Sequence, residues 1–313
     1  MSPTTQAGQA DGADRADRAP EGPVLVAETS APLASGTRMG LRRFARNKFA
    51  VVGLAAIAFL ILFCFFGPIF YPTDQIHTAL NQVNLAPSAA HLLGTDAVGR
   101  DELGRLMYGG KVSLLVGLGA GLLATVIGTL WGSVAGYAGG WVDAVMMRIV
   151  DAGIAIPALF ILLVVSAITT PGVPGLVLIL GLVSWLVPSR LVRAETLTLK
   201  NRDYVLTLRA IGGTHGRAIT RHILPNAVST IVVAATFQVA DAILLVAYVS
   251  YLGLGVQPPQ TDWGGMLSAG LTAVYSGRWW LILPPGLAVI LVVCAFNAVG
   301  DGLRDAFGVR GRS

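Results

Sequence analysis

The chain has 313 residues, of which 54% are hydrophobic and only 12% are charged. This composition excludes a soluble globular domain, in which about 25% of residues are charged, and it predicts an integral membrane protein. The net charge of +5 does not indicate nucleic-acid binding, because the basic residues stand beside the apolar segments, where they set membrane orientation. Cys64 and Cys294 lie inside apolar segments, so neither a disulfide nor a metal site is predicted.

The first 36 residues are rich in Ala, Gly, Asp, Arg, Pro and Ser and hold few large apolar side chains. Such a segment cannot bury enough surface to offset the entropy of ordering, which predicts a disordered cytoplasmic tail over residues 1–36. It lacks the apolar core of a secretory signal peptide. We expect residues 37–307 to form the transmembrane domain and residues 308–313 a short cytoplasmic tail.

Six charge-poor segments are long enough to span a membrane, and they predict an all-α membrane protein with six transmembrane helices. Their approximate bounds are 49–71, 112–136, 144–168, 172–190, 227–252 and 280–300. If both termini are cytoplasmic, sixteen Lys and Arg residues of residues 37–313 lie on the cytoplasmic side and only four lie outside, and two more are in the tail of residues 1–36. This bias favours that orientation, because basic residues are enriched in cytoplasmic loops.

The segment of residues 72–111 is then external, and it contains the run Leu-Gly-Thr-Asp-Ala-Val-Gly-Arg-Asp at positions 93–101. Asp96, Arg100 and Asp101 fall close together on an expected tight turn. One interpretation is a self-contained ionic cluster that holds the loop together. The alternative is a direct contact with an external partner protein.

Small residues four apart follow two neighbouring ridges of the second segment. One ridge consists of Ala120, Ala124, Gly128, Gly132, Gly136 and Gly140, and the other of Gly117, Gly121, Thr125, Thr129 and Ser133. Such ridges let two helix backbones approach closely in lipid, and we expect the partner helix within this chain rather than in another subunit. In the third segment, Arg148 and Asp151 are spaced for a local ion pair, and Pro157 should bend the helix.

Asp241 lies near the middle of the fifth segment, with Gln238 one turn away on the expected same face. An ionised carboxylate at that depth costs about 2.5 to 3.5 kcal/mol on insertion scales, so Asp241 should face water or a partner. Two interpretations stay open: both residues line a translocation path, or Asp241 pairs with a helix of another subunit. After this segment, the run at positions 250–259 contains two glycines and ends in two prolines, which predicts a segment that folds back toward the membrane. Three tryptophans near the external boundary are expected to be interfacial anchors: Trp263, Trp279 and Trp280.

The only long polar insertion between apolar segments covers residues 200–225. A helical start at Asp203–Ile211, a break at Gly212 and Gly213, and a second helical run closed by Pro225 predict a short helix, a turn and another helix outside the lipid. Taken alone, this stretch is also compatible with a basic amphipathic helix on the membrane surface.

Four of these motifs carry a family resemblance. Gly212 and Pro225 stand thirteen positions apart with Leu224 before the proline, which resembles the cytoplasmic coupling loop of ABC-importer permeases. The run at positions 93–101 resembles the signature of the C-type permease subunit of dipeptide and oligopeptide importers. Two further segments are similar to the same family: the run at 250–259 with the Trp-Gly that follows it, and the ending at 295–305. The sequence departs from the family at Leu206-Thr207-Leu208, where Glu-Ala-Ala is usual.

The resemblance implies a type I ABC-importer permease fold with cytoplasmic coupling helices, in the inner membrane with both termini cytoplasmic. It implies a second, B-type permease subunit, ABC ATPase subunits that bind ATP and Mg²⁺, an external substrate-binding protein and a peptide substrate, with lipid around the spans. The residues expected to couple to the ATPase are Leu206, Leu208, Arg209, Ala210, Ile211, Gly212, Arg217 and Arg221. Leu206 and Leu208 keep an apolar docking face despite the missing glutamate.

No catalytic or nucleotide-binding motif is found in the sequence: there is no Gly-x-x-x-x-Gly-Lys-Ser/Thr, His-Glu-x-x-His, Gly-x-Ser-x-Gly or Cys-x-x-Cys. We therefore expect a subunit that is not an enzyme and carries no cofactor of its own. A permease of the same superfamily for nickel or another small solute is an alternative, because such subunits share these motifs. A secondary transporter or channel is a further alternative, but internal repeats are not apparent and only Asp241 is charged deep in a segment.

Overall fold

The computed structural model describes residue 40 and residues 42–308, and within them it is built from helices and loops without a β-strand. The expected tail of residues 1–36 and residues 309–313 lie outside the described residues. The helices are α2 (Lys48–Phe70), α3 (Glu102–Ala138), α4 (Gly140–Ile154), α5 (Ala158–Thr169), α6 (Val173–Ser184), α7 (Leu186–Leu199), α8 (Asp203–Ala210), α9 (His215–Ala218), α10 (Leu224–Tyr251), α11 (Trp263–Gly270) and α12 (Leu283–Gly308).

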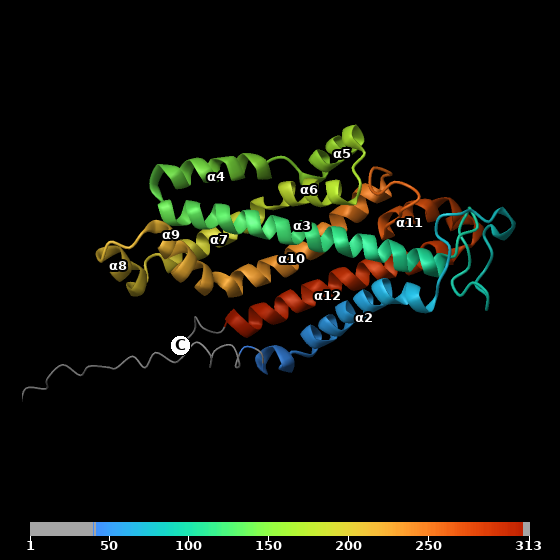
Figure 1. Ribbon diagram of the computed structural model, residues 1–313, viewed down its shortest axis with the longest axis horizontal. Helices are drawn as coiled ribbons and strands as arrows, with labels where there is room; N and C mark the ends of the chain where they lie inside the picture. The colour runs from blue at the N-terminus through green and yellow to red at the C-terminus, as the bar shows by residue number, and fades with distance from the viewer. Residues whose placement is uncertain (1–39, 41, 309–313) are drawn as a thin grey trace, which may run out of the picture.

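Four described helices are each long and apolar enough to cross a membrane, and the number becomes six when two bent helix pairs are each counted as one span. The bent pairs are α4 with α5, at 73°, and α6 with α7, at 46°. Figure 1 shows α3 running along the long axis of the molecule, with the loops that follow α2 at one end and α8 and α9 at the other. The all-α membrane fold expected from the sequence is confirmed.

The second spanning helix, α3, begins at Glu102 rather than near residue 112, so the loop before it is shorter than expected. Asp101 caps α3, since its Oδ1 accepts the N–H of Gly104 at 2.8 Å. The sequence-based start near residue 112 was placed after the last charged residue of the loop. The cap at Asp101 stabilises an earlier helix start, so the first turns of α3 carry polar residues. Arg105 and Lys111 consequently lie on the helix.

The break between α4 and α5 falls at Pro157, as expected from the missing N–H of proline. The local ion pair expected between Arg148 and Asp151 is wrong. Asp151 pairs with Arg190 of α7, and Arg193 of α7 donates to both carboxylate oxygens of Asp143, at 2.5 and 2.6 Å. A sequence shows the spacing along one helix but not which helix packs against it.

The small-residue ridges of α3 meet two helices of the same chain, so the expected intrachain contact is confirmed. A methyl group at Gly121 would stand 2.9 Å from the backbone nitrogen of Val239 on α10, and one at Gly128 would stand 2.8 Å from the carbonyl oxygen of Trp185, at the start of α7. These distances are shorter than van der Waals contact. Glycine at these positions therefore lets α3 pack directly against the backbones of α7 and α10.

The end of the molecule opposite α8 and α9 is closed by α11, which packs against α10, α12 and α3. Of the three tryptophans expected at the membrane interface, only Trp279 is well exposed. Trp263 is fully buried and its indole N–H donates to the carbonyl of Leu106 at 3.0 Å, while Trp280 is buried and its indole N–H donates to the carbonyl of Thr95 at 3.4 Å. The interfacial role is therefore wrong for Trp263 and Trp280, because each indole N–H finds a partner inside the fold.

Candidate functional site

The polar insertion of residues 200–225 folds as α8, a tight turn, α9 and a π-helical turn over Ile219–Ile223 that runs directly into α10. Gly212 has φ +79°, a conformation that favours glycine. Its N–H donates to the carbonyl of Arg209 at 3.1 Å, and the N–H of Gly213 donates to that of Leu208 at 2.8 Å, which ends α8. Thr214 then caps α9 by accepting the N–H of Arg217 at 3.4 Å.

Pro225 does not close a helix, contrary to the sequence-based expectation. It lies in the first turn of α10, after the π-helical turn, and helix continues from His215 to Tyr251. Proline has no N–H to donate one turn back, and the π-helical turn, in which the N–H of Leu224 donates to the carbonyl of Ile219, lies at this place in the helix. The insertion is therefore joined to a spanning helix without an intervening loop, and a displacement of α9 acts directly on α10.

The inner side of the insertion packs on the ends of α3 and α7. Val205, Ala218 and Ile223 are fully buried in one apolar cluster with Tyr137 and Leu199. This cluster fixes the insertion to the spanning helices.

Polar contacts strengthen the same attachment. The guanidinium of Arg209 lies 4.8 Å from the centroid of the Tyr137 ring, and its Nε donates to the Tyr137 hydroxyl at 3.2 Å. Lys200 Nζ donates to the carbonyl of Gly136 at 2.8 Å. Sequence reasoning missed Tyr137, since a tyrosine at the end of an apolar segment carries no signal that a loop seventy residues later will cover it.

The outer side of the insertion is exposed and partly apolar. Ile211 is 77% exposed and Leu206 is 46% exposed, which is unfavourable for apolar side chains unless another surface covers them. Six of the eight expected coupling residues lie on the outer side: Leu206, Ala210, Ile211, Gly212, Arg217 and Arg221. Leu208 is half-buried beneath Gly213, whereas Arg209 is exposed but has its guanidinium on the Tyr137 ring, so both contact the chain itself.

Gln238 and Asp241 do not share a surface in the structure. Gln238 is buried at 7% exposure, whereas Asp241 is exposed. No cationic group of the described residues lies within 4.0 Å of the Asp241 carboxylate. Side chains three residues apart on a helix point about 60° from each other, and at this separation Gln238 packs inside the chain while Asp241 lies open.

In the run at positions 93–101, the carboxylate of Asp96 accepts hydrogen bonds from the turn that follows it. Its Oδ1 accepts the N–H groups of Val98 at 2.9 Å and Arg100 at 2.8 Å. Its Oδ2 lies 3.4 Å from Nε of Arg105, while the Arg100 guanidinium donates to the carbonyl of Ile76 at 3.4 Å. The turn thus satisfies its own carboxylate, but the ionic partner is Arg105 rather than Arg100.

Asp101 is buried and combines three contacts. Besides capping α3, its carboxylate accepts from the Tyr71 hydroxyl at 2.9 Å, and its Oδ2 lies 2.9 Å from Nδ1 of His91. Burial and the neighbouring Asp101 carboxylate raise the pKa of the Tyr71 hydroxyl. Tyr71 and His91 were missed by sequence reasoning because they lie outside the conspicuous run.

Comparisons with known proteins agree with this architecture. Residues 128–312 match the family described as binding-protein-dependent transport system inner membrane component, and residues 35–87 match the N-terminal TM domain of oligopeptide transport permease C. The dipeptide transport system permease protein of Bacillus subtilis is 38% identical over 88% of this chain and 86% of its own length. A putative peptide permease protein of Brucella suis is 42% identical over 90% of this chain and 94% of its own length.

A third relative, the oligopeptide transport system permease protein of Bacillus subtilis, is 39% identical over 84% of this chain and 86% of its own length. The two family matches and these relatives extend over most of the spanning helices described above. The chain therefore belongs to the family of inner membrane components of binding-protein-dependent transport systems.

Proposed function

We propose that this permease subunit serves an ATP-driven peptide importer. It forms half of the translocation path together with a B-type permease subunit, and an external binding protein delivers the peptide. ABC ATPase subunits bind ATP and Mg²⁺ and drive the chain through its cytoplasmic insertion. A peptide is favoured over nickel because the relatives named above are peptide permeases by their own names.

The observation that carries this proposal is the two-sided construction of the insertion. Its inner side is anchored on Tyr137 and the apolar cluster, and its outer side presents Leu206 and Ile211 unburied. A cleft on an ATPase subunit would cover this outer apolar side, with Arg217 and Arg221 available for charged contacts. Because α9 continues into α10, closure of the ATPases would tilt a helix that crosses the membrane.

We also propose that both termini are cytoplasmic. Asn47, which caps the first spanning helix, lies 3.4 Å from the carboxylate of Asp305 near the end of the last one. Figure 1 places both these ends in the half of the molecule that holds α8, opposite the loops after α2. This arrangement fits a cytoplasmic side with both termini and the insertion, and an external side with the run at 93–101 available to the binding protein.

A photoreactive benzoylphenylalanine in place of Ile211 tests the docking surface. In membranes that contain the assembled importer, we expect the label to cross-link this chain to an ATPase subunit, because Ile211 protrudes from the outer side of the insertion. Phe59 gives a matched control, since it is an aromatic residue 59% exposed in the middle of α2, and a label there should react only with lipid or another membrane subunit. Adducts with lipid alone at position 211 would contradict the proposal.

Asp241→Asn tests the translocation path. We expect peptide uptake in reconstituted vesicles to fall several-fold with normal assembly of the importer, because an exposed carboxylate in a spanning helix can attract the amino group of a passing peptide. The alternative, a pair with the partner permease, predicts that less complex is recovered on purification. Unchanged uptake together with unchanged assembly would remove Asp241 from the path.

A further inference from the structure

A cavity of about 620 Å³ lies at the external end of α3, away from both Gln238 and Asp241. Three parts of the chain that are distant in sequence form most of its wall: the segment Thr73–Ile76 after α2, one side of α3, and the segment Pro259–Thr261 ahead of α11. Its volume falls in the range of small-ligand sites, about 300 to 1,000 Å³. None of the roles discussed above uses this cavity.

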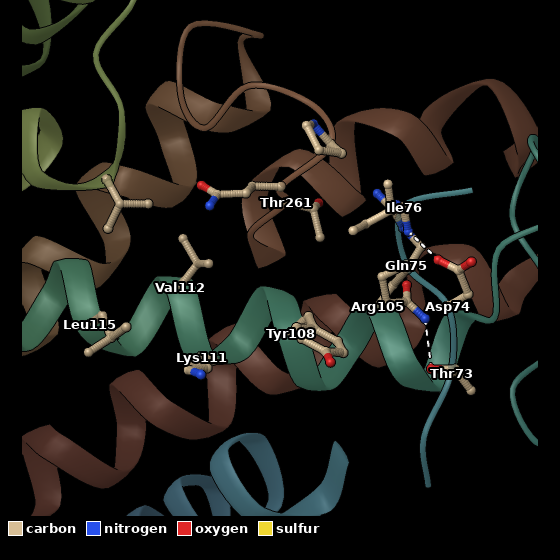
Figure 2. A pocket seen from close by; sticks show the side chains of 13 residues that line it. Thr73, Asp74, Gln75, Ile76, Arg105, Tyr108, Lys111, Val112, Leu115 and Thr261 are labelled. Atoms are coloured by element: carbon tan, nitrogen blue, oxygen red, sulfur yellow. Dashed lines mark hydrogen bonds between the residues drawn. The ribbon is translucent and has the colours of Figure 1, made fainter. Parts of the chain in front are cut away.

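The α3 wall of the cavity is ordered by the helical repeat. Tyr108, Val112 and Leu115 follow one another at intervals of three and four residues, and Figure 2 shows them along one side of α3 with Thr261 across from them. Val112 and Leu115 are apolar, whereas Tyr108, Thr261 and Gln260 supply groups that can form hydrogen bonds. The wall of the cavity thus combines apolar side chains with hydrogen-bonding groups, as sites for amphipathic small ligands do.

Two of the three charged groups in the wall are already satisfied within the chain. Arg105 pairs with Asp96. Asp74 accepts the N–H groups of Ile76 at 2.8 Å and His77 at 3.1 Å and lies 2.6 Å from the His77 ring, and these contacts lower the pKa of the Asp74 carboxyl to about 2.

Lys111 is the third charged group in the wall. Its ammonium lies 5.7 Å from the centroid of the Phe65 ring, and none of the carboxylates of the described residues lies within 4.0 Å of it. An ammonium group that lies beside an apolar wall and an aromatic ring, and that has no anionic partner among the described residues, can bind an anionic group of a ligand.

We propose that this cavity is a receiving site for the C-terminal carboxylate of the transported peptide, with Lys111 as the residue that binds it. The apolar wall of Val112 and Leu115 accepts the last side chain, and Gln260 and Thr261 bind backbone groups of the peptide. The site lies at the external end of the spans, so it holds the peptide as the binding protein releases it. This inference deepens the proposed function and rests on it.

Uptake of two peptides by the complete importer in vesicles provides the test. The peptides share one sequence and differ only in a free or an amidated C-terminus, and uptake is compared at equal, saturating occupancy of the binding protein, measured beforehand on that protein alone. We expect the wild-type importer to prefer the free carboxylate by at least about tenfold, the lower end of what one hydrogen bond to a charged group contributes. Lys111→Met should abolish this preference, whereas Lys111→Arg should keep most of it.

Arg278→Met is the matched control, because Arg278 is an external cation that does not line the cavity. It should leave the preference for the free carboxylate unchanged. An equal fall in uptake of both peptides with Lys111→Met would overturn the inference. If that fall disappears when anionic phospholipid is left out of the vesicles, the anion bound by Lys111 is a lipid phosphate.

Failure of the inference can be told apart from failure of the proposed function. If the wild-type importer carries neither peptide, the peptide-importer proposal itself fails. If it carries both peptides and Lys111→Met changes nothing, only the receiving site is excluded.

Discussion

Replacing Gly212 by proline is expected to reduce peptide uptake to background while the assembled importer continues to hydrolyse ATP. Gly212 holds φ at +79° and donates its N–H to the carbonyl of Arg209. Proline fixes φ near −65° and has no N–H, so it is incompatible with the turn on both counts. The turn would have to rearrange, and α8 would no longer be held at its present angle to α9, while the spanning helices are untouched.

The measurement is the ratio of peptide imported to ATP hydrolysed in reconstituted vesicles. Gly212→Ala is the graded control, because alanine keeps the N–H and meets only the cost of a positive φ, about 1 to 2 kcal/mol. We expect its ratio to lie between those of the wild type and Gly212→Pro. A normal ratio in Gly212→Pro would show that the turn does not transmit the motion of the ATPases.

Local patterns in the sequence were sufficient for the helical class, the insertion and its turn. Apolar length predicts spanning helices, and Pro157 and Gly212 mark real breaks because their backbone requirements do not depend on neighbours. The small residues on α3 predict a close helix contact for the same reason. These features are encoded by the residues themselves.

Features that depend on which elements meet in space could not be predicted. Arg193 reaches Asp143 from a helix fifty residues away, and Trp263 is buried rather than interfacial because the backbone of α3 offers its indole a carbonyl. Leu208 and Arg209 sit in the same helix as Leu206 but turn toward the spans. The helical period shows that these side chains have different directions, and only the position of Tyr137 decides which direction is inward.

The cavity at Lys111 is a further example of a feature without a local signal. Three separate segments build it, and the sequence suggested only that Lys111 stood at the border of a span. Among the described residues no carboxylate lies within 4.0 Å of Lys111, and only the structure shows that Asp96 pairs with Arg105 and Asp74 with His77 instead.

Gly132→Leu is expected to have the largest effect on assembly. A side chain at Gly132 would overlap the carbonyl oxygen of Ser189 and stand 2.9 Å from the backbone nitrogen of Arg193, so α3 and α7 would have to separate. Overpacking of a tight contact costs about 1 to 3 kcal/mol or more. Here the rigid backbone of α7 cannot yield as a side chain would, and the ion pair of Arg193 with Asp143 lies at the same contact.

We therefore expect little complex to be recovered with Gly132→Leu, and what is recovered should melt at a clearly lower temperature than the wild type. Val134→Leu is the matched control, because it introduces the same side chain two residues further along α3, at a position 45% exposed. That variant should assemble normally, since its side chain points away from α7. Normal recovery and melting of Gly132→Leu would mean that α3 and α7 do not meet backbone to backbone, and the attachment of the polar insertion to the end of α3 would then lose its support.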